Sequence, residues 1–189
     1  RSAISAIISQ NLGAGNLKTL TNFPAQAILF NVLLSFILLF STYFFIEDIL
    51  LFLRAEGKIL EFSKEYYYIR IWGFPLTLFT FAIFGLFRGL QNTFWPMIIA
   101  SIGVFINVGL DFIFVYGLED FMEPMGVKGA AWASLIAQLV MALLALVLVV
   151  TKTNISLKLK RKVHPEVKRL ISMSFNLFIR SVALNIALL

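Results

Sequence analysis

The stretch Pro24–Ile46, PAQAILFNVLLSFILLFSTYFFI, contains no charged side chain. A helix rises about 1.5 Å per residue, so about 20 apolar residues cross a hydrocarbon core about 30 Å thick. This stretch is long enough and apolar enough, and it predicts a transmembrane α-helix. The fold of the remaining chain has to be compatible with this span.

The whole chain has the composition of a membrane protein. It is 60% hydrophobic and 14% charged, its mean hydropathy is +0.90, and 20 of its 189 residues are phenylalanine. A water-soluble domain of this size needs more polar surface than these residues supply. Because the backbone must satisfy its own hydrogen bonds in lipid, apolar segments of this length predict helices. The predicted fold class is an all-α membrane protein, a polytopic helical bundle.

Further spans are predicted on both sides of the first. Short polar loops separate them, so spans that follow each other are expected to run antiparallel. Pro75 lies inside one of them, where the loss of a backbone donor is expected to kink the helix. Complete spans are predicted at 66–87, 95–116 and 127–150, and partial ones at Arg1–Leu12, which ends in the Gly13–Asn16 loop, and from Val167 onward.

Both ends of the chain look cut. The sequence starts with Arg1 and not with methionine, and residues 175–189 are still apolar where it stops. We therefore expect an internal piece of a longer protein. The sequence contains no cysteine, which excludes disulfides and thiolate chemistry within it.

Basic residues predict the orientation in the membrane. Seven of the 16 Lys and Arg residues lie between Lys152 and Arg169, in one short polar stretch between apolar runs. Such a cluster is typical of a cytoplasmic loop, whereas nucleic-acid binding would be a much rarer explanation. Placing this loop inside also places Lys18 and Arg88 inside, and it leaves the fewer basic residues Arg54, Lys58, Lys64 and Lys128 outside. The predicted location is the inner (plasma) membrane, as a multi-pass protein in the lipid bilayer.

Asp111 is the acidic residue that lies well inside a predicted span. An ionised carboxylate is costly in hydrocarbon, so such a group normally faces a watery cavity, pairs with a partner or carries a proton. Asn107 lies four residues earlier, which places both side chains on one helix face. Its amide could donate to the carboxylate or share a cation with it. The alternative is that Asp111 merely reaches the interface near Tyr116.

Other polar residues inside the spans have a structural and a functional interpretation. The small residues of Gly126–Ser134 favour close helix packing, although Ser134 and Gln138 could instead line the same cavity as Asp111. Arg70 either snorkels to the interface or pairs with a neighbouring helix. His164 is expected to be a solvated loop histidine. No metal-ligand spacing and no phosphate-binding glycine loop occurs in the sequence.

Four segments follow one another along nearly the whole chain. They are Ser9–Gly15 (SQNLGAG), Phe87–Pro96 (FRGLQNTFWP), the pair Asn107 and Asp111, and Gly126–Ser134 (GVKGAAWAS). As a set they resemble the multidrug and toxic compound extrusion (MATE) transporters, most closely the bacterial DNA-damage-inducible branch.

The resemblance implies a fold of twelve helices in two six-helix lobes. Residues 1–150 would then be most of the N-terminal lobe, from the end of helix 2 to helix 6. Residues 151–166 would be the basic cytoplasmic inter-lobe loop, and 167–189 the start of helix 7. The chain would pack against helix 1 and the C-terminal lobe, which this sequence does not contain. Members export organic cations and other amphipathic small molecules in exchange for protons or sodium, and they are not enzymes.

The resemblance also implies a coupling site. In this branch it consists of an acid on helix 1 and an Asn and an Asp on helix 5, which Asn107 and Asp111 match. These two residues would bind a proton or a sodium ion, with no other cofactor. Ser134 matches a hydroxyl residue on helix 6, where the family more often has threonine. The helix 1 acid is absent from this sequence.

Three other functions are weighed against this one. A flippase for lipid-linked oligosaccharides shares the lobe architecture, but it should have a larger cationic lumen. An intramembrane enzyme would need a nucleophile and a base, or metal ligands, within the bilayer. A purely structural scaffold would leave Asp111 unexplained.

Overall fold

The computed structural model describes residues 3–118, 122–153 and 164–187, with the backbone alone for 17–22 and 186. These residues form seven α-helices and one isolated β-bridge between Leu118 and Met122, so the predicted all-α fold is confirmed. The helices are α1 (Ala3–Gly13), α2 (Leu17–Phe52), α3 (Gly57–Arg70), α4 (Gly73–Gly89), α5 (Phe94–Tyr116), α6 (Val127–Lys152) and α7 (Pro165–Ala187).

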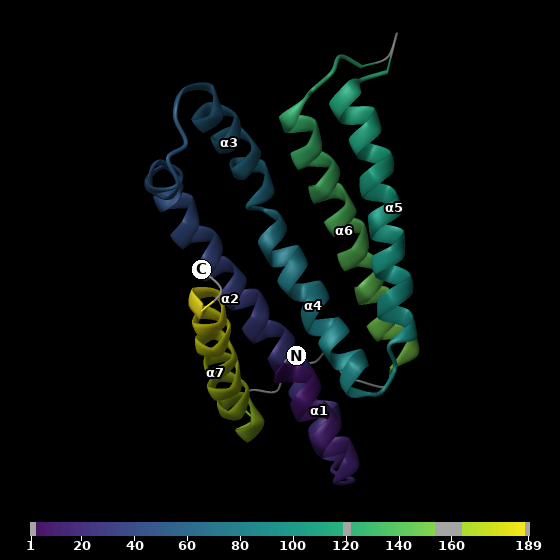
Figure 1. The fold of residues 1–189 in the computed structure, drawn as a ribbon. Helices are drawn as coiled ribbons and strands as arrows, with labels where there is room; N and C mark the ends of the chain where they lie inside the picture. Colours follow the sequence, from purple (N-terminus) through teal and green to yellow (C-terminus); the bar gives the residue numbers. More distant parts are fainter. Residues whose placement is uncertain (1–2, 119–121, 154–163, 188–189) are drawn as a thin grey trace.

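The long helices lie side by side (Figure 1). α2 packs on α4, both α3 and α4 pack on α6, and α6 packs extensively on α5. α6 therefore lies between α4 and α5, although α4 and α5 follow each other in sequence. The first and last helices, α1 and α7, pack on each other and on α2, and α1 also packs on α4.

Three described helices are long and apolar enough to cross a membrane, namely Phe23–Phe52, Phe94–Tyr116 and Val127–Lys152. A fourth span is formed if the bent pair α3 and α4 counts as one. These four overlap the complete spans predicted from the sequence, although the α3–α4 pair begins at Gly57, nine residues before the predicted start of that span. α7 begins close to the predicted Val167, but among the described helices it does not meet the same criterion. It contains four charged residues: Glu166, Lys168, Arg169 and Arg180.

The sequence predicts a single helix kinked at Pro75, and the structure shows two helices instead. α3 ends at Arg70 and α4 starts at Gly73, with an angle of 50° between them. Proline removes one N–H, and its ring clashes with the carbonyl group four residues earlier, which here belongs to Ile71. The Ile71 carbonyl instead accepts a 3.1 Å bond from the Phe74 N–H. The break thus lies at Ile71, and Pro75 occupies the first turn of α4.

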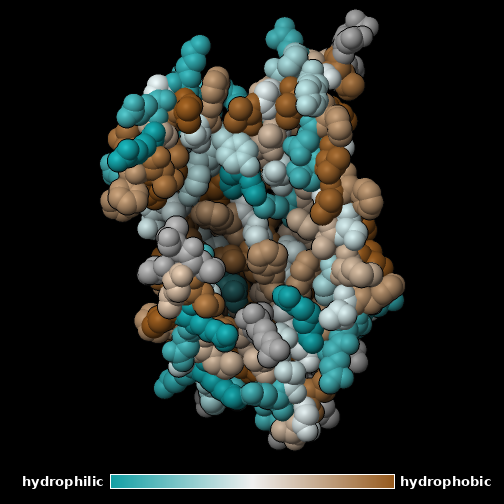
Figure 2. Space-filling model, viewed as in Figure 1, coloured by the Kyte–Doolittle hydropathy of each residue, from teal (hydrophilic) through white to brown (hydrophobic). Residues whose placement is uncertain are grey.

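The apolar core lies where α1, α2, α4, α6 and α7 meet. Its fully buried side chains include Ile8, Phe23, Ile83, Val149 and Leu170. Elsewhere large apolar side chains are exposed, such as Phe105 of α5 at 78%. Figure 2 shows apolar residues over much of the surface and a hollow at the centre of this face, with hydrophilic residues beside it. Apolar surface of this extent suits contact with lipid or with further apolar protein.

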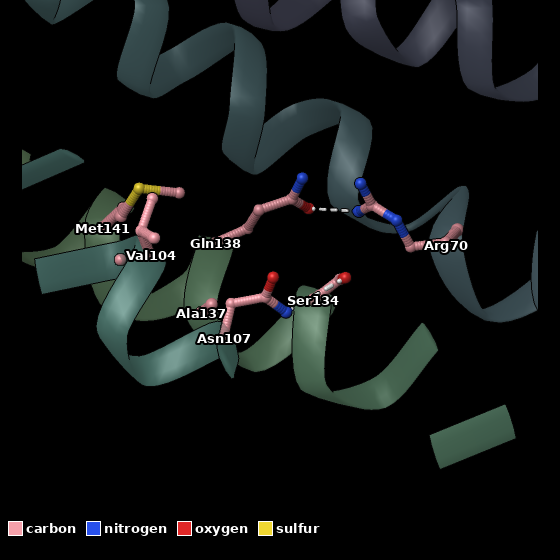
Figure 3. A pocket seen from close by; sticks show the side chains of 8 residues that line it. Arg70, Val104, Asn107, Ser134, Ala137, Gln138 and Met141 are labelled. Atoms are coloured by element: carbon pink, nitrogen blue, oxygen red, sulfur yellow. Dashed lines mark hydrogen bonds between the residues drawn. The ribbon is translucent and has the colours of Figure 1, made fainter. Parts of the chain in front are cut away.

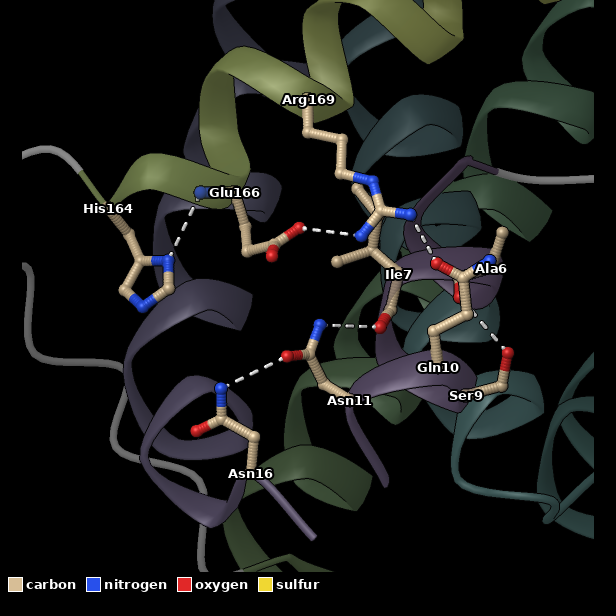
Figure 4. A network of polar contacts seen from close by, with 9 residues as sticks. All are labelled: Ala6, Ile7, Ser9, Gln10, Asn11, Asn16, His164, Glu166 and Arg169. Atoms are coloured by element: carbon tan, nitrogen blue, oxygen red, sulfur yellow. Dashed lines mark hydrogen bonds and ion pairs between the residues drawn. The ribbon is translucent and has the colours of Figure 1, made fainter. Parts of the chain in front are cut away.

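Polar contacts hold α7 against α1 (Figure 4). Arg169 donates to the Gln10 side chain and pairs with Glu166 at 3.4 Å. His164 lies half-buried with its ring centroid 6.3 Å from that of Phe23, so the prediction of a solvated histidine is wrong. The contact of His164 itself with α2 accounts for the difference, since its backbone N–H also donates to Gln26 Oε1 at 2.7 Å. Residues 154–163, most of the predicted basic loop, lie outside the described residues.

Candidate functional site

α5 carries the two residues that the sequence singles out. Asn107 lies about 20 Å along the helix from Phe94 and about 14 Å from Tyr116, at about 1.5 Å per residue. Asp111 follows one turn later. Both side chains are half-buried. Asn107 therefore lies near the middle of the helix, and Asp111 lies about 7.5 Å from its Tyr116 end.

Asn107 lines a pocket between α3, α5 and α6 (Figure 3). The pocket has a volume of about 160 Å³. Its polar side chains come from the three helices, and its other walls are apolar. It is lined by Arg70, Gly103, Val104, Asn107, Ser134, Ala137, Gln138 and Met141.

Two hydrogen bonds connect the helices across this pocket. The Arg70 guanidinium donates from Nη1 to Gln138 Oε1 at 2.8 Å, which joins α3 to α6. The Asn107 amide donates from Nδ2 to Ser134 Oγ at 3.3 Å, which joins α5 to α6. All four side chains are half-buried. The pocket is thus framed by polar groups that hold one another in place.

Glycine at position 73 permits this arrangement. An added Cβ would lie 2.1 Å from Gln138 Oε1 and 3.0 Å from Arg70 Nη1. The first distance is far below van der Waals contact, so a side chain at this position would displace the Gln138 amide. The start of α4 is therefore in direct contact with the hydrogen-bonded pair.

Asp111 lines a second, adjacent pocket of about 310 Å³. All of its lining residues belong to α5: Val108, Asp111, Phe112, Val115 and Tyr116. The Asp111 Oδ1 atom is buried and has no hydrogen-bond partner among the described residues. An unpaired buried carboxylate oxygen is costly, so a proton, a cation or a polar group would stabilise it.

The structure brings together three of the four predicted site residues. Asn107, Ser134 and Gln138 line one pocket, and Asp111 lines the neighbouring one. The Asn107 amide donates to Ser134, and no bond joins it to Asp111 among the described contacts. Arg70 completes the first pocket, and the sequence did not place it there. The sequence feature that pointed to it is a guanidinium in an otherwise apolar span, three residues before Gly73 and five before Pro75.

The small residues at the start of α6 serve close packing. Gly129, Ala133 and Ala137 lie four residues apart and are buried. A Cβ on Gly129 would lie 2.4 Å from the Phe114 carbonyl oxygen of α5. The packing interpretation of this segment is therefore confirmed for these residues. Their close approach brings Ser134 within reach of Asn107.

A sodium ion would need several oxygen ligands, and the described residues offer few. Asp111 provides a carboxylate with one unpaired oxygen, and the Asn107 carbonyl oxygen lies one turn away. Within the described ranges, no group of three or more His, Cys, Asp or Glu residues could hold a metal ion. A sodium ion at Asp111 would therefore need further oxygen ligands besides these two side chains.

The apolar helices with a polar pocket between them define a polytopic helical membrane protein. The family model MatE matches residues 1–113, and the chain belongs to this family of transporters, which are not enzymes. It is 31% identical over 136 residues to a "Probable multidrug resistance protein NorM" of Thermotoga maritima, covering 70% of this chain and 28% of that protein. It is 30% identical over 141 residues to "Multidrug and toxin extrusion protein 1" of Danio rerio, covering 72% of this chain and 22% of that one.

Solved structures show the same fold. A crystal structure of a MATE protein in the bent conformation superposes with a TM-score of 0.81 at 22% identity. The match covers 89% of this chain and 38% of that protein. The matches therefore cover between 22% and 38% of these proteins.

Proposed function

We propose that this chain is the larger part of the N-terminal lobe of a secondary active antiporter. The antiporter exports organic cations, drugs or related amphipathic compounds in exchange for protons or sodium. One observation carries the proposal. A carboxylate oxygen of Asp111 is buried inside an apolar helix without a partner, which is the state expected of a group that binds and releases a cation.

The proposed mechanism uses Asp111 as the coupling group. In the ionised state its unpaired oxygen attracts a cation, either the coupling ion or a positively charged substrate. Protonation removes the negative charge of the carboxylate, and with it the electrostatic attraction for that cation. Two ligands that compete for one carboxylate are exchanged and not carried together. A difference in affinity of a few kcal/mol between the two states is enough to shift their populations.

The neighbouring pocket supplies the proposed substrate cavity. Asn107, Ser134 and Gln138 provide amide and hydroxyl groups on otherwise apolar walls, a combination suited to amphipathic ligands. Asn107 lies on the same helix as Asp111, one turn away. A shift or rotation of α5 would therefore change both pockets together.

The surroundings of this lobe are proposed with it. All the lining residues of the Asp111 pocket belong to α5, which fits a helix 1 that supplies the opposite wall and a second acid. We propose that residues 1–150 form the lobe, 151–166 a basic cytoplasmic loop and 167–189 the start of a C-terminal lobe. Residence in the inner membrane and membership of the DNA-damage-inducible branch belong to the same proposal.

Efflux of a fluorescent cation from membrane vesicles tests the proposal. Full-length protein is compared with Asp111→Asn under an imposed proton gradient and, separately, under an imposed sodium gradient. We expect one of the two gradients to drive transport by the wild type, and the substitution to abolish it at normal levels of membrane insertion. Full gradient-driven transport by Asp111→Asn would contradict the proposal. Absence of transport by the wild type under either gradient would contradict the antiport itself.

A further inference from the structure

The pocket between α3, α5 and α6 has a positive charge and no negative one. Arg70 lines it, and no carboxylate of the described residues does. None of the ion pairs among those residues includes Arg70. The acidic side chain of Glu65, on the same helix, pairs with Lys128 at 3.0 Å instead. Arg70 donates instead to the neutral Gln138 side chain. No carboxylate among the described residues therefore neutralises the guanidinium charge in this part of the apolar bundle.

An arginine in this position has hydrogen-bonding capacity left. A guanidinium carries five N–H donors, and one bond to Gln138 is present among the described contacts. That bond holds the guanidinium plane in one orientation and leaves its other N–H groups without a described partner. A fork of donors held in this way is suited to a planar acceptor with two oxygens, because both oxygens can be bound at once.

The break between α3 and α4 lies directly beside Arg70. α4 starts at Gly73, in contact with Arg70 and Gln138, and Pro75 in its first turn has no N–H. The negative end of α3 and the positive end of α4 meet at this break and largely offset each other, so Arg70 supplies the positive charge of the pocket. In membrane proteins, non-helical backbone of this kind is tolerated where it lines a cavity.

The other polar groups suit the same ligand. The Ser134 hydroxyl accepts from Asn107, so its own hydrogen is available to an acceptor in the pocket. The rest of the wall is apolar, with Val104, Ala137 and Met141. We infer that this pocket binds the carboxylate of an amphipathic substrate between Arg70 and Ser134, with its apolar part against the α5 and α6 side chains.

This inference rests on the proposed function and narrows its substrate class. Asp111 and Arg70 line separate pockets, so the cation of the coupling reaction and the anionic group of the substrate have different places. A carboxylate-bearing compound would be bound at Arg70 whether Asp111 is protonated or not. Binding measured without an ion gradient therefore tests the pocket independently of antiport.

Three fluorescent probes with one apolar body provide the test. Pyrenebutyrate carries a carboxylate, its primary amide is neutral, and pyrenebutyltrimethylammonium is a cation. Each is titrated against the full-length protein in lipid nanodiscs, as wild type and as Arg70→Gln, Arg70→Lys and Arg88→Gln. Arg88 is a matched control, since it is exposed, lies at the other end of α4 and donates to the Phe84 carbonyl.

We expect the wild type to bind pyrenebutyrate about tenfold or more tightly than the amide, because charge-assisted bonds are roughly twice as strong as neutral ones. Arg70→Gln should remove this preference without weakening the binding of the ammonium probe. Arg70→Lys should keep part of the preference, and Arg88→Gln should keep it in full. Acetate should displace pyrenebutyrate from the wild type at concentrations where phosphate does not.

Four results would overturn the inference. In the first, the wild type binds pyrenebutyrate no more tightly than its amide, or does not bind pyrenebutyrate. Arg70→Gln would retain the preference, or it would weaken all three probes equally, as expected of a residue that only holds the helices together. Displacement by phosphate and not by acetate would assign the site to an inorganic anion instead of a substrate carboxylate.

Discussion

Arg70 Nη1 lies 2.8 Å from Gln138 Oε1, and Gly73 packs directly against the same Gln138 amide. One hydrogen bond thus connects the end of α3 to the middle of α6 at the point where the α3–α4 span bends by 50°. The bend, the glycine and the polar pair form one structural unit. The space for the Gln138 side chain exists because position 73 has no Cβ.

Gly73→Ala should therefore destabilise the protein. The added Cβ would lie 2.1 Å from Gln138 Oε1, so the flexible Gln138 side chain would have to move and lose its bond from Arg70, at a cost of about 0.5–1.5 kcal/mol. Thermal unfolding in detergent, followed by tryptophan fluorescence, would show a lower Tm.

Gly109→Ala is the control for this substitution. A Cβ at Gly109 would meet nothing within 4 Å, and alanine has the higher helix propensity. Its Tm should equal or exceed that of the wild type. An unchanged Tm in Gly73→Ala would contradict the close packing at the break.

The bond between Asn107 and Ser134 should give a measurable coupling energy. The two side chains are 3.3 Å apart on α5 and α6. Hydrogen bonds between membrane helices are worth about 0.6 kcal/mol on average in such measurements. The unfolding free energies of Asn107→Ala, Ser134→Ala and the double substitution complete the cycle. Strictly additive losses would show that the two side chains do not interact.

Ala133 tests the packing of α6 on its neighbours. It is fully buried, whereas Leu139 on the same helix is 45% exposed. Ala133→Phe has no space for a ring and should abolish the folded, monodisperse protein in size-exclusion chromatography. Leu139→Phe places the same ring on an exposed face and should leave the elution profile unchanged. Equal tolerance of the two substitutions would be inconsistent with the α5–α6 interface.

The predicted orientation can be tested with single cysteines, since the sequence has none of its own. Lys58 lies at the start of α3 and Thr153 directly after α6, on sides that the basic residues assign to the outside and the cytoplasm. In intact cells, a membrane-impermeant maleimide should label Lys58→Cys. It should label Thr153→Cys only after permeabilisation. The reverse pattern would invert the orientation.

Much of this fold follows from the sequence because lipid imposes a simple rule. Apolar runs such as Pro24–Ile46 have to be helical in a bilayer, and the spans of α5 and α6 agree with their predicted ends within two residues. The other two were predicted too short, by six residues at the end of α2 and by nine at the start of α3. The bend was misplaced because proline acts on the carbonyl of Ile71, four residues earlier, and not at its own position.

The candidate site was only partly predictable. Helical spacing places Asn107 near Asp111, but it does not tell which neighbour the amide will bind. The partner, Ser134, depends on the close approach of α5 and α6, which Gly129 permits. The role of Arg70 depends on α3 lying beside α6, and helix order in space cannot be derived from loop length alone.

Ion-driven transport by Asp111→Asn tests the central claim most directly. Full-length protein in proteoliposomes is compared with Asp111→Asn and with Asp48→Asn, which alters an exposed acid near the end of α2. Uphill accumulation of substrate under an ion gradient and substrate binding without a gradient are measured on the same preparations. The account predicts that Asp111→Asn loses uphill accumulation while it still binds carboxylate probes at Arg70, and that Asp48→Asn retains both. Uphill accumulation by Asp111→Asn at the wild-type rate would contradict it.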